Sequence, residues 1–344
     1  MALYPLLRPL IFALDAERAH ALSLEALRAM PVGRKSPAED SALVSMVAGL
    51  RFPNPVGLAA GYDKDAKAPS QLLTLGFGFT EVGTLTPLPQ SGNPRPRLFR
   101  LVEDEAVINR MGFNNGGQQA ALVRLAKGKR RGLIGVNIGA NKDASDRIAD
   151  YVHGVRTMMG VADYLTVNIS SPNTPGLRAL QDRAALDDLL ARVMDARGGE
   201  GPPVFLKVAP DLEPADIDDI SAAVISYRID ALIVSNTTIS RPPLRSRHGG
   251  EAGGLSGAPL RSLALQRLRD FRKATGGAMP LIGVGGIASA EDAYARIRAG
   301  ASLVQLYSAL VYEGPGLAKR IAGGLKALLA RDGFANVAQA VGME

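Results

Sequence analysis

The residues best suited to chemistry lie in one short run, residues 167–174, with the sequence VNISSPNT. An apolar segment leads there into two side-chain amides, Asn168 and Asn173, and two serine hydroxyls. Amides carry a hydrogen-bond donor and an acceptor without charge, so they suit a ligand that itself presents amide groups. Ser171 lies between them and is a candidate for proton transfer. Such residues also close ordinary turns after a strand, so this run alone leaves both interpretations open.

The surrounding chain must position these groups, and from about residue 50 it alternates between short apolar segments and helix-patterned ones. The predicted strands are residues 55–60, 79–83, 133–138, 164–169, 204–208, 231–235, 281–284 and 303–306. The predicted helices are residues 64–75, 116–127, 145–159, 182–197, 214–226, 260–274, 290–299 and 316–331. Strands that are apolar throughout are typical of a parallel sheet covered on both faces. Eight such units predict an α/β fold, a (β/α)8 TIM barrel with an N-terminal helical extension. A doubly wound open sheet is the alternative, because periodicity does not prove closure; no G-x-G-x-x-G follows the first strand to support a dinucleotide-binding version.

Polar residues collect where the predicted strands end. Lys64 follows the first strand, Thr84 the second, Asn137 the third and Asn236 the sixth. Two long connections, rich in glycine, proline and arginine, follow the second and sixth strands. Barrel enzymes build their sites at the carboxyl ends of the strands, so this end is the expected site.

A lysine and a glycine cluster indicate what this site binds. Lys207 ends an apolar strand, and a lysine in that position needs a counter-charge or a ligand. Gly285 and Gly286 precede a helix that begins near Ser289, and backbone N–H groups at such a turn favour a phosphate. A phosphate and a lysine in these places would bracket a flat cofactor across the barrel mouth. FMN fits, because its reduced ring is anionic and favours a nearby cation.

Composition excludes several classes of function. The chain of 344 residues has no cysteine, which excludes disulfides, cysteine-ligated iron–sulfur clusters and a cysteine base. Its three histidines are far apart in sequence, so we expect no metal site. The net charge of +7 is compatible with an anionic ligand, an anionic membrane surface or nucleic acid, but the basic residues are scattered and we expect no nucleic-acid partner. No stretch reaches the roughly 20 apolar residues of a membrane-spanning helix.

An ordered set of motifs adds a specific resemblance. GLAAGYDKD (57–65), INRMGFNN (108–115), VNISSPNTPGLR (167–178), LKVAPD (206–211), SNTT (235–238), IGVGGI (282–287) and LVQLYS (303–308) follow one another along the chain. With them the chain resembles the quinone-linked, membrane-associated class of dihydroorotate dehydrogenases. The resemblance implies that dihydroorotate is oxidised to orotate in pyrimidine biosynthesis, that FMN takes the hydride, and that a membrane quinone reoxidises the flavin.

The resemblance also assigns roles to residues. Ser171 matches the catalytic base, aided by a water or hydroxyl relay to which Thr174 is a candidate contributor. The substrate residues it implies are Lys64, Asn109, Arg110, Met111, Gly112, Phe113, Asn168, Asn173, Asn236 and Thr237. The FMN residues it implies are Ala60, Gly61, Lys64, Thr84, Asn137, Asn168, Lys207, Ser235, Gly257, Gly286, Tyr307 and Ser308.

Residues 1–40 form a predicted amphipathic helical piece, ahead of a catalytic domain at 41–344. Periodicity alone allows a helical pair that caps the barrel or one that lies on a membrane. The resemblance favours the membrane, with His20, Arg100 and Tyr307 lining the quinone route. It implies a peripheral protein on the cytoplasmic side of the inner membrane, and we expect a monomer.

Three rival functions remain at this point. An FMN-dependent dihydrouridine synthase would use the basic surface for tRNA, but the family uses a cysteine acid and this chain has none. A soluble fumarate- or NAD-linked enzyme for the same substrate is opposed by Ser171 and by the N-terminal helices. A non-catalytic protein that binds a membrane surface or nucleic acid on a barrel scaffold would contain no flavin.

Overall fold

A computed structural model describes residues 4–32 and 39–344, and within them eight parallel strands close into a barrel. The strands of the barrel pair in the order β10-β12-β13-β3-β4-β7-β8-β9. Their bounds are β3 (Val56–Leu58), β4 (Phe79–Leu85), β7 (Leu133–Ile138), β8 (Tyr164–Asn168), β9 (Val204–Val208), β10 (Ala231–Val234), β12 (Leu281–Val284) and β13 (Ala301–Leu306). The predicted barrel is therefore confirmed, and the open-sheet alternative is wrong.

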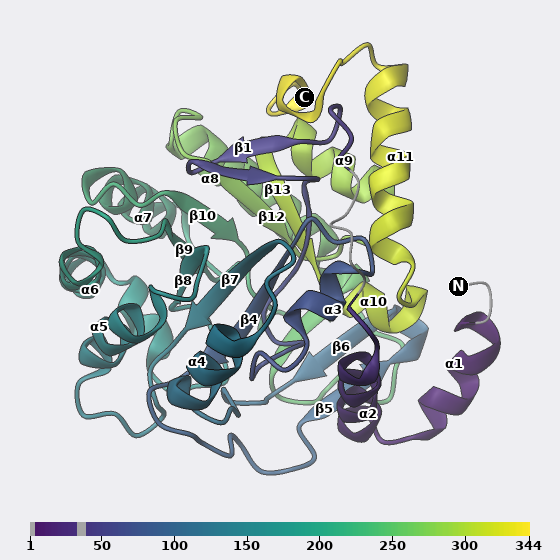
Figure 1. Cartoon of the computed structure of the whole chain (residues 1–344), viewed down its shortest axis with the longest axis horizontal. Helices are drawn as coiled ribbons and strands as arrows, with labels where there is room; N and C mark the ends of the chain where they lie inside the picture. The colour runs from purple at the N-terminus through teal and green to yellow at the C-terminus, as the bar shows by residue number, and fades with distance from the viewer. Residues whose placement is uncertain (1–3, 33–38) are drawn as a thin grey trace.

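Helices surround the barrel, as Figure 1 shows. They are α3 (Pro69–Leu73), α4 (Gln118–Lys127), α5 (Arg147–Met158), α6 (Arg183–Arg197), α7 (Pro214–Ser226), α8 (Arg261–Ala274), α9 (Ala290–Arg298), α10 (Ser308–Glu313), α11 (Leu317–Arg331) and α12 (Val337–Ala340), with 3-10 turns at Val102–Asp104, Leu177–Gln181 and Ala258–Leu260. The strands bury side chains on both faces, which explains their continuous apolar pattern.

The first predicted helix, at 64–75, is much shorter than the sequence pattern suggested. Only Pro69–Leu73 is helical, because the buried Asp63 carboxylate accepts the backbone N–H groups of Lys67 and Ala68 and holds residues 64–68 in a turn. Pro69 then occupies the first turn of the helix, where its missing N–H costs nothing.

The two long insertions build a small sheet that the sequence pattern did not predict. Strands β5 (Leu98–Leu101), β6 (Ala106–Asn109) and β11 (Gly254–Gly257) pair antiparallel in the order β11-β6-β5. A hairpin of β1 (Ser45–Val47) and β2 (Leu50–Phe52) lies at the opposite end of the barrel (Figure 1). Its Phe52 packs against Phe79 of β4. The barrel is thus closed at the hairpin end, and its other end carries the small sheet.

Two helices precede the barrel, α1 (Tyr4–Ala13) and α2 (Ala16–Ala29), and they lie beside β5 and β6 (Figure 1). Helix α1 buries none of its residues, whereas α2 buries Leu24 and Leu27. Residues 1–3 and 33–38 of the predicted 1–40 piece lie outside the described residues, and its boundary stays a prediction. In the described part, no helix has both the length and the apolar character to cross a bilayer.

Candidate functional site

One cavity of about 650 Å³ opens where the strands end, between the barrel, the small sheet and helix α2. Most of the predicted site residues line it: His20, Ala60, Gly61, Lys64, Thr84, Arg100, Asn109, Met111, Gly112, Phe113, Asn168, Ser171, Asn173, Lys207, Ser235, Asn236, Thr237, Gly257, Gly286, Tyr307 and Ser308. These residues belong to separate motifs. They come together because the carboxyl ends of parallel strands meet on one rim.

Two predicted residues do not line the cavity. Asn137 is fully buried in the cavity floor, where its side-chain oxygen accepts a hydrogen bond from Thr84 Oγ1 at 2.6 Å. Arg110 turns away, and its guanidinium binds the Glu251 carboxylate at 2.8 Å and the Ala252 carbonyl. Asn137 therefore orients Thr84, and the Arg110 side chain ties β6 to the 240–258 insertion.

The floor of the cavity is a network of buried amides. Asn168 Nδ2 donates to Thr84 Oγ1 at 3.0 Å and to Asn137 Oδ1 at 3.2 Å. Asn137 Nδ2 in turn donates to the buried Glu81 carboxylate at 2.7 Å. Because each amide is held by its neighbour, its orientation is fixed before any ligand arrives.

A second group of amides lies on the wall of the cavity. Asn173 Nδ2 donates to Asn109 Oδ1 at 3.2 Å, which joins the loop after β8 to the small sheet. Asn236 Nδ2 donates to Ser170 Oγ at 2.8 Å, and Ser170 Oγ donates to Asn168 Oδ1 at 2.8 Å. Wall and floor together present uncharged donors and acceptors, which suit a ligand that carries amide groups.

Ser171 is nearly buried and lines this cavity. The backbone N–H of Asn173 donates to Ser171 Oγ at 3.2 Å. This donor stabilises negative charge on the oxygen, which helps the hydroxyl to exchange a proton. Thr174 Oγ1 nearby is buried without a hydrogen-bond partner among the described residues, so it is available to a relay.

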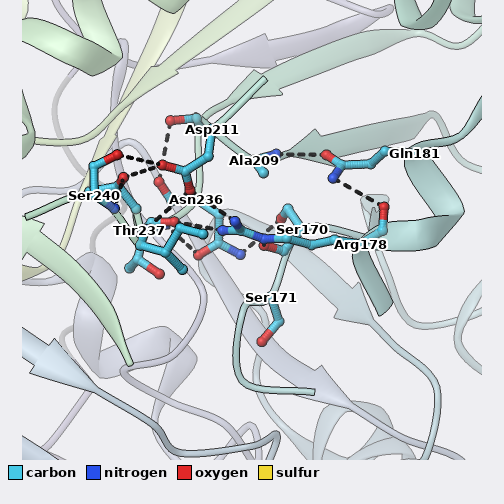
Figure 2. A network of polar contacts seen from close by, with 12 residues as sticks. Ser170, Ser171, Arg178, Gln181, Ala209, Asp211, Asn236, Thr237 and Ser240 are labelled. Atoms are coloured by element: carbon cyan, nitrogen blue, oxygen red, sulfur yellow. Dashed lines mark hydrogen bonds and ion pairs between the residues drawn. The ribbon is translucent and has the colours of Figure 1, made fainter. Parts of the chain in front are cut away.

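An arginine that the sequence reasoning did not single out holds the loop after β8 (Figure 2). Arg178 donates to the Ser170 carbonyl at 3.1 Å, to the Thr237 carbonyl at 3.0 Å and to the Asp211 carboxylate at 2.9 Å. Asp211 also accepts from Ile239 N–H and from the Thr238 hydroxyl. One guanidinium thus connects the ends of β8, β9 and β10. Its only sequence signal was its place at the end of the VNISSPNTPGLR motif.

Lys207 is the buried cation of the site. It forms no hydrogen bond or ion pair with any other described residue, and only about 5 % of it is exposed. Burial lowers the pKa of its ammonium group, and the Glu81 carboxylate partly opposes this shift. An anionic ligand in the cavity would offset the free-energy cost of burying this charge.

Lys64 supplies a second cation, and its Nζ donates to the Gly61 carbonyl at 2.8 Å. Burial lowers the pKa of Lys64 to about 8, although the Glu17 carboxylate opposes the shift. The lysine therefore remains largely protonated at neutral pH and can meet a carboxylate.

Three aromatic rings line the cavity next to α2. Tyr62 contacts His20 at 5.1 Å and Tyr307 at 5.6 Å between ring centroids, both edge to face. His20 Nδ1 and the Tyr307 hydroxyl oxygen are 3.3 Å apart. Arg100, the third residue of the predicted quinone route, donates to the carbonyls of Ile11 and Phe12 and so connects α1 to β5. Tyr62 had no role in the sequence interpretation, and the structure places its ring against both His20 and Tyr307.

The His20 ring gives a prediction for acid stability. Burial and the nearby Lys64 charge lower the pKa of His20 from 6.5 to about 3, so the fold favours the neutral ring. As the pH falls below 6.5, the unfolded chain binds a proton that the folded chain does not, and stability is lost. Between pH 7 and pH 5 we expect the free energy of unfolding of the wild type to fall by about 2 kcal/mol more than that of His20→Gln, which has no imidazole to protonate. Denaturant unfolding at both pH values measures this, and an equal loss in wild type and variant would contradict it.

Comparison with known proteins places the chain among named enzymes. The family model described as dihydroorotate dehydrogenase matches residues 42–329. A protein of Sphingopyxis alaskensis named dihydroorotate dehydrogenase (quinone) is 66% identical over 99% of this chain and 97% of its own length. One of the same name from Erythrobacter litoralis is 64% identical over 99% of this chain and 100% of its own. The ligand-free crystal structure of DHODH from Eimeria tenella superimposes with a TM-score of 0.91 at 40% identity, covering 96% of this chain and 99% of that one. The same enzyme in complex with ferulenol gives a TM-score of 0.90 at 40% identity, covering 96% of this chain and 95% of that one.

Proposed function

This chain belongs to the quinone-linked dihydroorotate dehydrogenase family, and we propose that it oxidises (S)-dihydroorotate to orotate with FMN as hydride acceptor and a membrane quinone as the final oxidant. The observation that carries the proposal is a single cavity that joins the amide clusters, an unpaired buried lysine and a glycine turn. The reaction belongs to pyrimidine biosynthesis.

The described residues fit FMN. Lys207 offers a buried positive charge with no protein partner, and the backbone N–H groups of Gly285 and Gly286 line the cavity without a hydrogen-bond partner among the described residues. Both glycines have positive φ angles, 112° and 71°, a backbone conformation that residues with a Cβ rarely adopt. FMN, when bound, supplies a ring that accepts a hydride and a phosphate that needs such a site.

The wall amides would bind the pyrimidine ring. Dihydroorotate presents ring amides and one carboxylate, and Asn109, Asn173 and Asn236 present matching donors and acceptors. Thr237 lines the same wall. Lys64 would pair with the carboxylate, because it lines the same cavity and stays largely protonated at neutral pH.

Ser171 would remove the substrate proton through its Oγ atom. A hydroxyl is a weak base, so the proton must pass on to a water or to a second hydroxyl, and the unpaired Thr174 Oγ1 is the available one. The Asn173 N–H that donates to Ser171 Oγ stabilises the charge that develops there. Burial of Ser171 excludes bulk water from the reacting atoms.

The quinone would approach beside α2, where His20, Tyr62 and Tyr307 line the cavity. Helix α1 exposes Leu6, Leu7 and Leu10, a surface that suits the interface of a membrane. We therefore propose a peripheral protein on the cytoplasmic side of the inner membrane. We further propose that the protein acts as a monomer.

An absorbance experiment tests cofactor, substrate and oxidant together. The purified protein should show a flavin spectrum that bleaches when dihydroorotate is added without oxygen and recovers on addition of a soluble quinone. Flavin that stays oxidised would remove dihydroorotate as the substrate. A colourless protein that does not bind added FMN would overturn the proposed function as a whole.

A further inference from the structure

The largest fully buried side chain of the described residues is Arg296, and it lies directly behind the glycine turn. One guanidinium nitrogen donates to the carbonyl oxygens of Gly285 and Arg261, both at 2.7 Å. The Nε atom has no hydrogen-bond partner among the described residues, and Arg296 is only 1% exposed. The side chain does not line the cavity, so it would act through the turn and not by contact with a ligand.

The positive charge of Arg296 is not neutralised by an ion pair in the described part of the chain. Asp292 is the carboxylate whose charge acts on it, but Asp292 pairs with Arg261 Nε at 3.0 Å and accepts the Ala288 N–H. Burial lowers the pKa of Arg296 to about 10, so the guanidinium stays charged at neutral pH. A buried cation without a direct counter-ion is costly, which implies that something else offsets the charge.

The hydrogen bond to Gly285 also orients the turn. A peptide group is planar and trans, so a carbonyl held on the Arg296 side directs the N–H of Gly286 the opposite way. The N–H groups of Gly285, Gly286 and Ile287 have no acceptor among the described residues, and all three residues line the cavity. A carbonyl that accepts from a cation also polarises its own peptide group, which strengthens the N–H as a donor.

We propose that Arg296 is a positioning residue and a buried counter-charge for the phosphate of FMN, and that it sets the preference of the apoprotein for FMN over flavins without a phosphate. The inference rests on the proposed function, because it takes FMN as the cofactor. It adds a residue behind the cavity wall that is responsible for phosphate selectivity.

Binding of two flavins tests this inference, because riboflavin shares the ring of FMN and lacks its phosphate. Dissociation constants of the full-length apoprotein for both are measured by flavin fluorescence. In Arg296→Met we expect the affinity for FMN to fall about tenfold or more, while that for riboflavin changes less than about threefold. Arg298→Met is the matched control, because Arg298 lies on the same helix but pairs with Asp332 at 3.4 Å, away from the turn. It should leave both affinities unchanged.

Each outcome separates the two proposals. If Arg296→Met lowers both affinities equally, Arg296 is a structural residue and the inference is wrong. If the variant leaves both affinities unchanged, Arg296 does not act on the phosphate and the inference alone fails. If the wild-type apoprotein binds neither flavin, the proposed function fails with it. Should Arg296→Met not fold, Arg296→Gln keeps a polar side chain at the position, removes the charge, and is expected to lose the FMN preference to a similar extent.

Discussion

Replacing Ser171 by alanine should slow the reduction of the flavin by dihydroorotate about 10²- to 10⁴-fold, because the hydroxyl is the only group proposed to accept the substrate proton. The change removes one oxygen from a nearly buried site and leaves the amide clusters in place. Orotate and FMN should therefore bind as in the wild type. Anaerobic stopped-flow absorbance measures the reduction rate, and titration of the flavin spectrum with orotate measures product affinity.

Ser170→Ala is the matched control for this result. It deletes the same atom one residue earlier, where the hydroxyl connects Asn168 to Asn236. Loss of this connection should weaken orotate binding about tenfold, while reduction at saturating dihydroorotate should fall far less than in Ser171→Ala. If Ser171→Ala reduces flavin at the wild-type rate, Ser171 is not the base. If both variants lose orotate binding equally, Ser171 positions the ligand.

The barrel and its rim could be predicted because their signals are local. Each strand is an apolar run of a few residues, and parallel strands place their carboxyl ends together whatever the loops contain. Lys207 could be identified for the same reason. A lysine at the end of a buried strand is unusual, and this can be recognised without knowing which residues surround it in the fold. The motifs then assigned roles to residues that the strands had already brought to one rim.

The unpredicted features depend on contacts between distant parts of the chain. Strand β6 pairs with β11, which is about 150 residues away in sequence, and neither strand has a strong alternating pattern of its own. Arg110 was assigned to the substrate through its motif, but its orientation is decided by Glu251 in the other insertion. Arg178 and Arg296 bind backbone carbonyls. Every residue has a backbone carbonyl, so the sequence does not indicate which ones an arginine binds. Such contacts become visible only when the fold is known.

Substitutions on the exposed edge of helix α1 should abolish turnover with a quinone that is dissolved in a membrane. Leu6 and Leu10 are 73% and 70% exposed and lie one helical turn apart, so they form one apolar edge. Burial of a leucine stabilises by about 1.5–3 kcal/mol, so Leu6→Glu with Leu10→Glu should weaken vesicle binding about 100-fold or more. Co-sedimentation with vesicles of phosphatidylethanolamine and phosphatidylglycerol measures the binding.

Turnover distinguishes membrane docking from a role of α1 in the quinone site itself. The double variant should lose activity with a long-chain quinone in vesicles and keep it with a short-chain soluble quinone, because His20, Tyr62 and Tyr307 are unchanged. Val123→Glu with Ile225→Glu is the matched control, since these apolar residues are also exposed but belong to α4 and α7 on the barrel wall. Equal loss with both quinones would mean that α1 shapes the quinone entry, and undiminished vesicle binding would remove α1 from the membrane contact. The arrangement of α1 favours docking, because its leucines face solvent while Arg100 holds the helix to the small sheet through backbone carbonyls.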